Sequence, residues 1–410
     1  MSSLSPREKP RVGLLATHPV QYYVPWYRQL AQVLDLEVFY CHRQTAEGQA
    51  RAGFGVPFEW DVPLLDGYPH RFLPNRARKP DVSSFFGCNT PDVGRIIRHG
   101  AFDAFIVHGW AIRSFWQAII ACWRSGTPVL VRGDSQLPSA RPGLVRLAKR
   151  PLYRFFIPRF DAYLVVGQRA RDYYVHYGAE PRRMFFTPHA VDNDFFRDRA
   201  EALRKEREHL RAAWGIPAGA TVFLFVGKLS HEKRPSDFVR AVGVASRDRP
   251  GIWGLVVGDG RLRPALESQV TEAACPVRFT GFLNQTEMPK AYAASDALVL
   301  PSSSETWGLV VNEAMASGLP AVVSDRVGCG PDLVLRGETG EVFACGAIVE
   351  LASILARLAG DPPLLARLGG QAQRLVQRYS PVEAVKGTVA AVQSVMGARI
   401  ASAGTVSRGV

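Results

Sequence analysis

Short apolar runs alternate with helical or loop segments along nearly the whole chain. Runs spaced in this way are typical of parallel strands whose crossover connections cover both faces of a sheet. In the first half the runs occupy residues 11–17, 36–41, 104–108, 128–132, 162–166 and 184–187. In the second half they occupy residues 221–226, 253–257, 277–280, 297–300, 320–323 and 341–344. The pattern predicts an α/β protein built on parallel sheets.

The chain has 410 residues, which is more than one hydrophobic core usually accommodates. A highly charged segment over residues 197–211 separates the two sets of apolar runs. We therefore expect an N-terminal domain over 1–200, a second domain over 201–385, and a C-terminal helix with a disordered tail over 386–410. Residues 45–89 are rich in Gly and Pro without clear periodicity, so an irregular lid or insertion is expected there.

The sequence lacks the marks of a membrane-spanning or secreted protein. No apolar run approaches the roughly 20 residues that a transmembrane helix needs. The first residues, MSSLSPREKPR, lack the apolar core of a secretory signal, so a cytosolic protein is expected. The six cysteines are scattered without a CxxC pair, which indicates neither a zinc site nor a disulfide framework.

The net charge of +13 is uneven. Residues 1–195 carry 25 Lys and Arg against 16 Asp and Glu, a balance of +9, whereas the remainder carries 25 against 21, a balance of +4. Such a basic half can attract anionic lipid, a phosphorylated ligand or nucleic acid, or it can reflect an Arg-rich coding bias. Residues 141–159 hold six basic and no acidic side chains among Leu, Tyr, Phe and Ile. This segment fits an amphipathic helix on an anionic membrane, or an ordinary helix with Arg outward.

The stretch over residues 297–325 carries the chemistry of the second half. It is expected to form a strand, a loop, a helix that begins near Gly308, and a second strand after Pro320. Gly318 stands where a left-handed helix cap belongs. Two carboxylates, Glu305 and Glu313, flank the start of the helix.

A helix start beside two acids is a specific chemical combination. Free N–H groups at the helix N-terminus bind phosphate, while carboxylates accept hydrogen bonds from hydroxyl groups. A sugar nucleotide carries both kinds of group. The alternative is that Glu305 is a solvated loop residue and Glu313 a surface residue.

Four further segments accompany the Glu305 to Glu313 segment in a fixed order: GKLSHEKRP at 227–235, VVGDG at 256–260 and FTGFL at 279–283 precede it, and GETG at 337–340 follows it. Together they resemble the C-terminal half of the retaining glycosyltransferases of family 4. The resemblance is specific over residues 221–343 and weaker over the first half. It implies the GT-B fold, in which two Rossmann-like domains face each other across a cleft.

The resemblance also implies which residues act. Lys228 and Lys233 would neutralise the departing diphosphate, although the family has Arg where this chain has Lys228. Glu313 would bind the ribose hydroxyls and Glu305 the transferred sugar. The implied binding residues are Gly227, Lys228, Lys233, Gly258, Gly260, Gly281, Phe282, Thr306, Trp307, Gly308, Leu309 and Glu313. The turn after residue 257 is no dinucleotide fingerprint, because Arg263 replaces its third glycine.

Candidates in the first half follow the ends of apolar runs, where ligands of parallel sheets bind. They are His18, His108 and Asp134, of which His108 is expected to act in catalysis. A histidine at a strand end can equally be a hydrogen-bonded structural residue. The family's Gly-rich loop after the first strand is replaced here by His18-Pro19-Val20-Gln21.

The expected activity is metal-independent, retaining transfer of a sugar from a nucleotide diphosphate to a hydroxyl of a glycan, lipid-linked saccharide or small molecule. No cofactor is expected, and the partners are the nucleotide sugar, the acceptor and a candidate anionic membrane surface at the inner face. Two alternatives are a sugar-nucleotide epimerase on the same fold and a non-enzymatic basic binder. Nucleic acid is not expected, because no recognised recognition module accompanies the basic residues.

Overall fold

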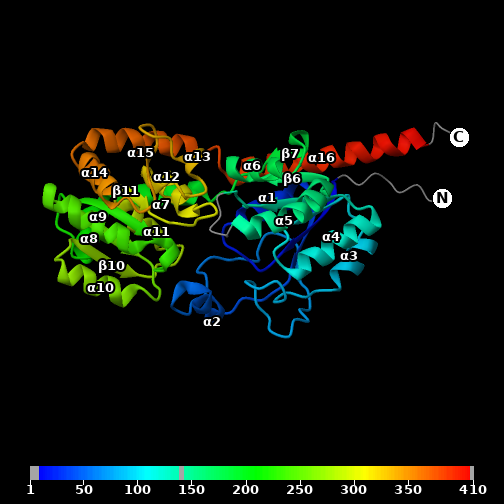
Figure 1. Ribbon diagram of the computed structural model, residues 1–410, viewed down its shortest axis with the longest axis horizontal. Coiled ribbons are helices and arrows are strands. Elements are labelled where there is room, and N and C mark those ends of the chain that lie inside the picture. The colour runs from blue at the N-terminus through cyan, green and yellow to red at the C-terminus, as the bar shows by residue number, and fades with distance from the viewer. Residues whose placement is uncertain (1–8, 138–142, 407–410) are drawn as a thin grey trace.

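Two parallel-sheet domains form the protein (Figure 1). The computed structural model describes residues 9–137 and 143–406. Within these residues the first sheet has seven strands in the order β3-β2-β1-β4-β5-β6-β7, and the second has six in the order β10-β9-β8-β11-β12-β13. Every strand pair is parallel. The predicted pair of Rossmann-like domains is confirmed.

The first domain follows the predicted alternation of strand and helix. Its elements are β1 (Arg11–Ala16), α1 (Val24–Val33), β2 (Asp35–Tyr40), α2 (Ala46–Gln49), η1 (Ala50–Phe54), β3 (His70–Phe72), α3 (Val93–His99), β4 (Ala104–Val107), α4 (Arg113–Ser125), β5 (Val129–Gly133), α5 (Gly143–Phe156), η2 (Ile157–Arg159), β6 (Ala162–Val165), α6 (Gln168–His176), η3 (Pro181–Arg183) and β7 (Met184–Phe186).

The second domain repeats this alternation around a shorter sheet. Its elements are α7 (Asn193–Leu203), η4 (Arg204–Glu206), α8 (Arg207–Ala213), β8 (Thr221–Val226), η5 (His231–Lys233), α9 (Pro235–Asp248), β9 (Ile252–Val257), α10 (Arg263–Glu272), β10 (Val277–Gly281), α11 (Met288–Ala294), β11 (Ala297–Leu300), α12 (Leu309–Ala316), β12 (Ala321–Ser324), α13 (Gly330–Leu333), β13 (Gly340–Phe343), α14 (Ile348–Ala359) and α15 (Pro362–Val376).

The central strands are apolar throughout because helices cover both faces of each sheet. In β1, Leu14 packs into the core on the side of α1, and its neighbour Leu15 packs into the core on the opposite side. Both side chains are fully buried. Successive residues of a strand point to opposite faces, so a strand buried on both faces must be apolar at every position.

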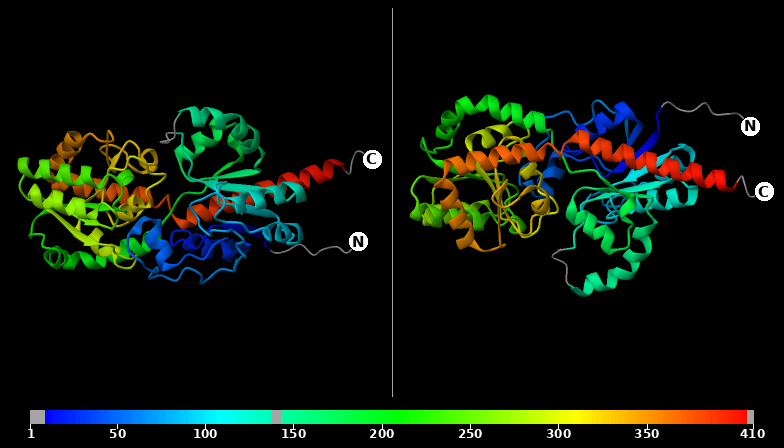
Figure 2. Two further views of the ribbon diagram at one scale, coloured as in Figure 1. Left: turned by 60° about the horizontal axis from the view of Figure 1, so that its bottom comes forward. Right: turned by 90° about the horizontal axis from the view of Figure 1, so that it is seen from above.

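The last helix, α16 (Pro381–Val406), leaves the second domain and packs on the first. Figure 2 shows this red helix running along the first domain. Ala391 and Val392 are buried there with residues of α1 and β1. Conversely, α7 packs on α11 and α12, so the boundary expected at residue 200 falls inside a helix of the second domain.

Residues 45–89 are largely irregular, as expected, but two details of the irregular segments differ from the expectation. Residues 45–89 contain α2, η1 and the edge strand β3, whose His70 pairs with Val38 of β2. The three-residue strand is too short to give a periodic signal. The C-terminal helix also continues to Val406, where disorder was expected. Residues 407–410 of the expected tail lie outside the described residues.

Candidate active site

A cavity of about 430 Å³ lies between the two domains, at the carboxyl ends of their central strands. Loops that follow β1, β5 and β7 line it from the first domain, and loops that follow β8, β9, β10 and β11 line it from the second. This is the edge at which ligands of parallel α/β sheets bind. The lining includes Gln21, Tyr22, Tyr23, Phe54, Trp60, Asp134, His189, Gly227, Lys228, Lys233, Gly258, Asp259, Phe282, Leu283, Glu305, Thr306, Trp307, Gly308, Leu309, Val310 and Glu313.

Glycines let the backbone turns of the second domain pack against one another beneath the cavity. Gly258 has φ +130°, and a Cβ atom there would lie 2.0 Å from the carbonyl oxygen of Gly227. Its amide donates to the carbonyl oxygen of Gly281 at 2.9 Å. A side chain at residue 258 would separate these turns, so the close approach requires glycine. Gly260 and Gly281 support the floor from behind and do not line the cavity themselves.

Lys228 and Lys233 bring positive charge to one end of the cavity. Burial, and then the charge of Lys233, lower the pKa of Lys228. Lys233 forms an ion pair with Glu305, and the side chains of both are mostly buried. Arg234, which follows in sequence, pairs with Asp237 at 2.6 Å and does not line the cavity. Glu232 and Asp259 line the cavity as well, and Asp259 is paired with Arg263 at 2.6 Å. The two ammonium groups are the cations that a diphosphate could meet at this end.

The start of α12 adds a second group for an anion. Its first residues, Leu309 and Val310, line the cavity together with Gly308. The first N–H groups of a helix have no carbonyl partner inside the helix and carry the positive end of its dipole. Gly308 has φ +100°, a conformation that glycine adopts without strain and that turns the loop into the helix.

Glu313 is 3% exposed and lies on α12 near the floor of the cavity. The hydroxyl of Tyr22 donates to its Oε1 at 2.7 Å, and the hydroxyl of Tyr292 donates to its Oε2 at 2.5 Å. Burial raises the pKa of Glu313 to about 7, against the opposing effect of these hydrogen bonds. Because Tyr22 belongs to the first domain, the hydrogen bond crosses the cleft. Both carboxylate oxygens of Glu313 thus accept from tyrosine hydroxyls, and a ribose presents the same kind of donor.

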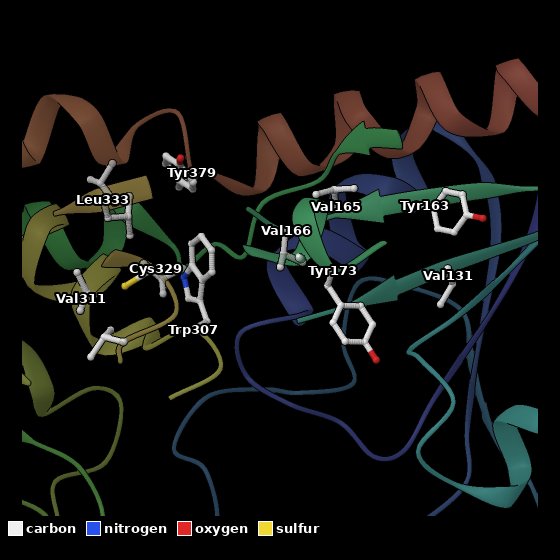
Figure 3. Packing of buried hydrophobic residues seen from close by; sticks show 14 of the residues in the cluster. Val131, Tyr163, Val165, Val166, Tyr173, Trp307, Val311, Cys329, Leu333 and Tyr379 are labelled. Atoms are coloured by element: carbon white, nitrogen blue, oxygen red, sulfur yellow. The ribbon is translucent and has the colours of Figure 1, made fainter. Parts of the chain in front are cut away.

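Trp307 closes the cavity at the junction of the domains. Its Nε1 donates to Oδ1 of Asn312 at 2.9 Å, which fixes the ring. In Figure 3 the ring lies between Cys329 of the second domain and Val166 of the first. A Cβ atom on Gly167 would lie 2.4 Å from the ring, so glycine is required for this approach. The backbone amide of Gln168 also donates to Asp332 at 3.0 Å, which holds the domains together here.

His189 and Asp134 provide polar atoms from the first domain. Arg132 donates to Nδ1 of His189 at 3.4 Å, and a guanidinium can only donate. Burial, and then the Arg132 charge, hold the pKa of His189 well below its usual value, so the imidazole is neutral. Its proton is therefore on Nε2, an atom that has no hydrogen-bond partner among the described residues and stands 3.9 Å from Oδ2 of Asp134. Nε2 is itself buried, whereas the Asp134 side chain is 43% exposed, so the Asp134 carboxylate is the group of this pair that a sugar hydroxyl can reach.

The structure brings together most residues that the sequence singled out. Eleven of the predicted residues line the cavity: Gly227, Lys228, Lys233, Gly258, Phe282, Glu305, Thr306, Trp307, Gly308, Leu309 and Glu313. Asp134 lines it too, whereas His18 and His108 do not. His108 packs against the ring of Tyr23 at 4.8 Å, and burial lowers its pKa to about 3. It therefore stands behind the cavity wall.

The sequence did not single out Tyr22, Tyr23, His189, Phe54 and Trp60 as site residues. Tyr22 and Tyr23 follow β1, so the rule that ligands bind at strand ends would have found them. His189 follows β7 and carries the same signal. Phe54 and Trp60 stand far from any of these strand ends, and only the fold brings them to the cavity.

Comparisons with known proteins cover both domains. Residues 18–195 match the family model "Glycosyltransferase Family 4", and residues 206–375 match "Glycosyl transferases group 1". A 2-deoxystreptamine glucosyltransferase of Streptomyces kanamyceticus is 36% identical over 224 residues, which are 54% of this chain and 57% of that protein. A D-inositol 3-phosphate glycosyltransferase of Corynebacterium aurimucosum is 28% identical over 392 residues, covering 92% of this chain and 90% of the relative. The chain thus spans little more than half of the first of these relatives.

Solved structures support the same architecture. Anabaena Alr3699/HepE in complex with UDP superposes with a TM-score of 0.71 at 17% identity, covering 94% of this chain and 100% of that one. WaaG, a glycosyltransferase involved in lipopolysaccharide biosynthesis, superposes with a TM-score of 0.64 at 18% identity, covering 91% and 98% of the two chains. At this identity the likeness concerns the fold.

Proposed function

Because the chain belongs to the family 4 glycosyltransferases, we propose that it transfers a sugar from a nucleotide diphosphate to a hydroxyl group, with retention of anomeric configuration. One observation carries the proposal. The lysine pair, the N-terminus of α12 and the buried Glu313 line one cavity at the strand ends. A diphosphate fits the lysine pair and the helix N-terminus, and the ribose of the same nucleotide fits the Glu313 carboxylate.

The two lysines act on the leaving group. As the bond between the anomeric carbon and the diphosphate oxygen breaks, negative charge grows on that oxygen. Lys228, Lys233 and the first amides of α12 stabilise this charge more strongly in the transition state than in the ground state, which lowers the barrier. Glu305 holds the Lys233 ammonium in place through their ion pair. Once a donor is bound, the diphosphate shares that ammonium and Glu305 can accept from the sugar hydroxyls.

Retention follows if the acceptor hydroxyl attacks the face from which the diphosphate departs. The new bond joins the acceptor oxygen to the anomeric carbon, and a diphosphate oxygen takes the acceptor proton. The Asp134 carboxylate would accept from a sugar hydroxyl on the first-domain side, with the buried His189 ring behind it. Since cationic side chains and helix amides neutralise the charge, the transfer is proposed to need neither metal nor cofactor.

The donor assay tests the proposal. UDP, GDP and ADP sugars are incubated with the protein in EDTA, alone and with acceptors that include 2-deoxystreptamine and inositol phosphate. UDP is the first choice of base, given the UDP complex of the Anabaena protein. Free nucleotide diphosphate that forms only with an acceptor, together with a glycoside of unchanged anomeric configuration, is the expected result. An altered sugar still attached to its nucleotide would instead identify an epimerase.

We also propose that α5 touches an anionic membrane surface, so that a lipid-linked acceptor can reach the cavity. Leu152 and Phe155 are 56% and 62% exposed, and the exposed Arg150 and Arg154 stand beside them in sequence. Apolar side chains next to cations are the combination by which interfacial helices bind anionic lipid. The basic residue Arg141 of the predicted segment lies outside the described residues. None of the helices in the described part of the chain has the length and apolarity to cross a bilayer.

Vesicle sedimentation checks this contact. The protein is expected to pellet with phosphatidylserine-containing vesicles, to be released by salt, and to remain in solution with neutral vesicles. Replacing both Leu152 and Phe155 by Ser should reduce the bound fraction several-fold. Val349→Ser, at a position 74% exposed on the second domain, is the matched control and should bind as the unaltered protein does. Equal recovery with neutral and anionic vesicles would remove the membrane from the proposal.

A further inference from the structure

Residues 50–61 of the first domain reach across the cleft to the loops that follow β9 and β10. Nδ2 of Asn284 donates to the carbonyl oxygen of Glu59 at 2.7 Å. The amide and the hydroxyl of Thr286 both donate to Asp61, the amide at 3.1 Å. Figure 2 shows this blue segment against the second domain in its left view. We call residues 50–61 the crossing segment.

Aromatic side chains of the crossing segment cover Phe282, the residue that follows β10. The ring centre of Phe58 lies 4.2 Å from the ring centre of Phe282, and the ring centre of Phe54 lies 5.9 Å from that of Phe282. Trp60 in turn packs edge to face on Phe58 at 4.9 Å. Phe282 is thus one member of an aromatic cluster to which both domains contribute.

The same segment reaches the cationic end of the cavity. Nζ of Lys228 stands 4.4 Å from the centre of the Phe54 ring. A Cβ atom on Gly55, which has φ +80°, would lie 3.1 Å from the amide nitrogen of Gly260. Phe54 and Trp60 line the cavity together with Phe282 and Leu283. A ligand beside these four side chains therefore touches both domains.

We propose that Phe54 and Trp60 form the outer wall of the nucleobase subsite, opposite Phe282 and Leu283. The inference rests on the proposed function, which puts the diphosphate on Lys228 and Lys233 and thereby directs the base to the aromatic end. Flat rings on either side of a base gain stacking energy whatever its hydrogen-bonding edge. The nucleotide is then held by both domains, and the hydrogen bonds from Asn284 and Thr286 keep the wall in position.

The wall also explains why the crossing segment contains glycines. Gly53 and Gly55 both have positive φ, and they flank Phe54 in the sequence. A Cβ atom on Gly53 would lie 3.3 Å from the side chain of Lys228. Glycine at both positions lets the backbone turn sharply enough to present Phe54 to the cavity. The segment is built to hold one aromatic ring over the site.

Calorimetry on the full chain separates the base from the diphosphate. The nucleoside diphosphate that binds most tightly among UDP, GDP and ADP is compared with inorganic pyrophosphate. Trp60→Ala and Phe54→Ala should each weaken nucleotide binding about tenfold, the scale of one lost stacking contact. Trp60→Ala should leave pyrophosphate binding unchanged, whereas Phe54→Ala also removes the ring that contacts Lys228, so its effect on pyrophosphate is measured beside it. Trp60→Phe should restore most of the affinity, because it keeps a flat ring. Phe86→Ala, at a position 69% exposed and outside the cavity lining, serves as the control and should bind both ligands normally.

Two results would overturn the inference. One is nucleotide affinity that stays unchanged in both alanine variants. The other is a loss of pyrophosphate affinity in Trp60→Ala that parallels its loss of nucleotide affinity. If an alanine variant of Phe54 or Trp60 fails to fold, Trp60→Phe combined with Asp61→Ala, which removes the acceptor of the Thr286 hydrogen bonds, should weaken nucleotide binding alone. Unchanged affinity in that double variant also refutes the wall. Failure of the proposed function would give a different result, because the unaltered protein would then bind none of UDP, GDP and ADP.

Discussion

Lys233→Ala is expected to lower kcat/KM for the sugar nucleotide by about 100-fold to 1000-fold, the loss measured when one group that stabilises transition-state charge is removed. In the proposed reaction the Lys233 ammonium neutralises the diphosphate, and its removal also leaves Glu305 without its ion-pair partner. A mostly buried carboxylate facing the diphosphate would then repel it. Steady-state kinetics with donor and acceptor varied separately measure the loss.

The repulsion has its own test. The double variant Lys233→Ala with Glu305→Gln removes the uncompensated charge together with the ammonium, so it should bind nucleotide diphosphate about tenfold more tightly than Lys233→Ala alone. Glu305→Gln by itself keeps the ammonium and should lower turnover with less effect on nucleotide binding. Additive losses in the double variant would show that the two side chains do not act together, and unchanged kinetics in all three variants would refute the site.

Glu313→Gln is expected to weaken nucleotide binding by about 10-fold to 100-fold, since hydrogen bonds to a charged acceptor contribute about 1.5–3 kcal/mol. Glutamine keeps the shape of the side chain but presents one oxygen where the carboxylate presents two. In the unaltered protein, affinity should rise with pH through about 7, as Glu313 loses its proton and becomes the better acceptor. The glutamine variant should lack this rise. Titration calorimetry between pH 5.5 and 8.5 makes the comparison.

Glu313→Gln should also have a higher free energy of unfolding than the unaltered protein at pH 8. Burial raises the pKa of Glu313 from 4.5 to about 7 in the folded protein, so the folded state binds this proton more tightly than the unfolded chain. The free energy of unfolding therefore falls as pH rises from about 4.5 to about 7, by up to about 3 kcal/mol. Glutamine carries no charge and escapes this loss. Urea denaturation should show the gain at pH 8 and little difference at pH 4.5, and a constant difference across that range would contradict the role of burial.

Sequence reasoning identified most of the fold because buried parallel strands are apolar at every position. The runs at 221–226 and 297–300 coincide with β8 and β11 to the residue. Gly318 ends α12 with φ +83°, as its place before Pro320 predicted. β3 was missed, because three residues at an edge carry too weak a pattern.

The second-domain half of the site was predictable for a related reason. Glu305 and Glu313 lie within one strand, loop and helix unit, so local spacing already brings them to the same end of the sheet. Tyr22 reaches Glu313 from 291 residues away, and no spacing rule relates the two. Trp60 depends likewise on how the domains close on each other. Contacts within one strand, loop and helix unit can be predicted from sequence spacing, whereas contacts across the cleft depend on the packing of the whole chain.

The path of the backbone restricts how the cleft can open. The chain passes between the domains at residues 187–192 and returns at residues 377–380. The passages touch each other, since the ring of Tyr379 lies 5.5 Å from that of Phe186, and Nδ2 of Asn193 donates to the carbonyl oxygen of Val376 at 3.1 Å. Because the two connections adjoin each other, the domains can rotate about them but can hardly slide past one another. A sugar-nucleotide donor would thus enter on the side of the cleft farthest from the two connections, where rotation separates the domains most. Each time the domains close, the strand ends of the two sheets would return to the same relative position.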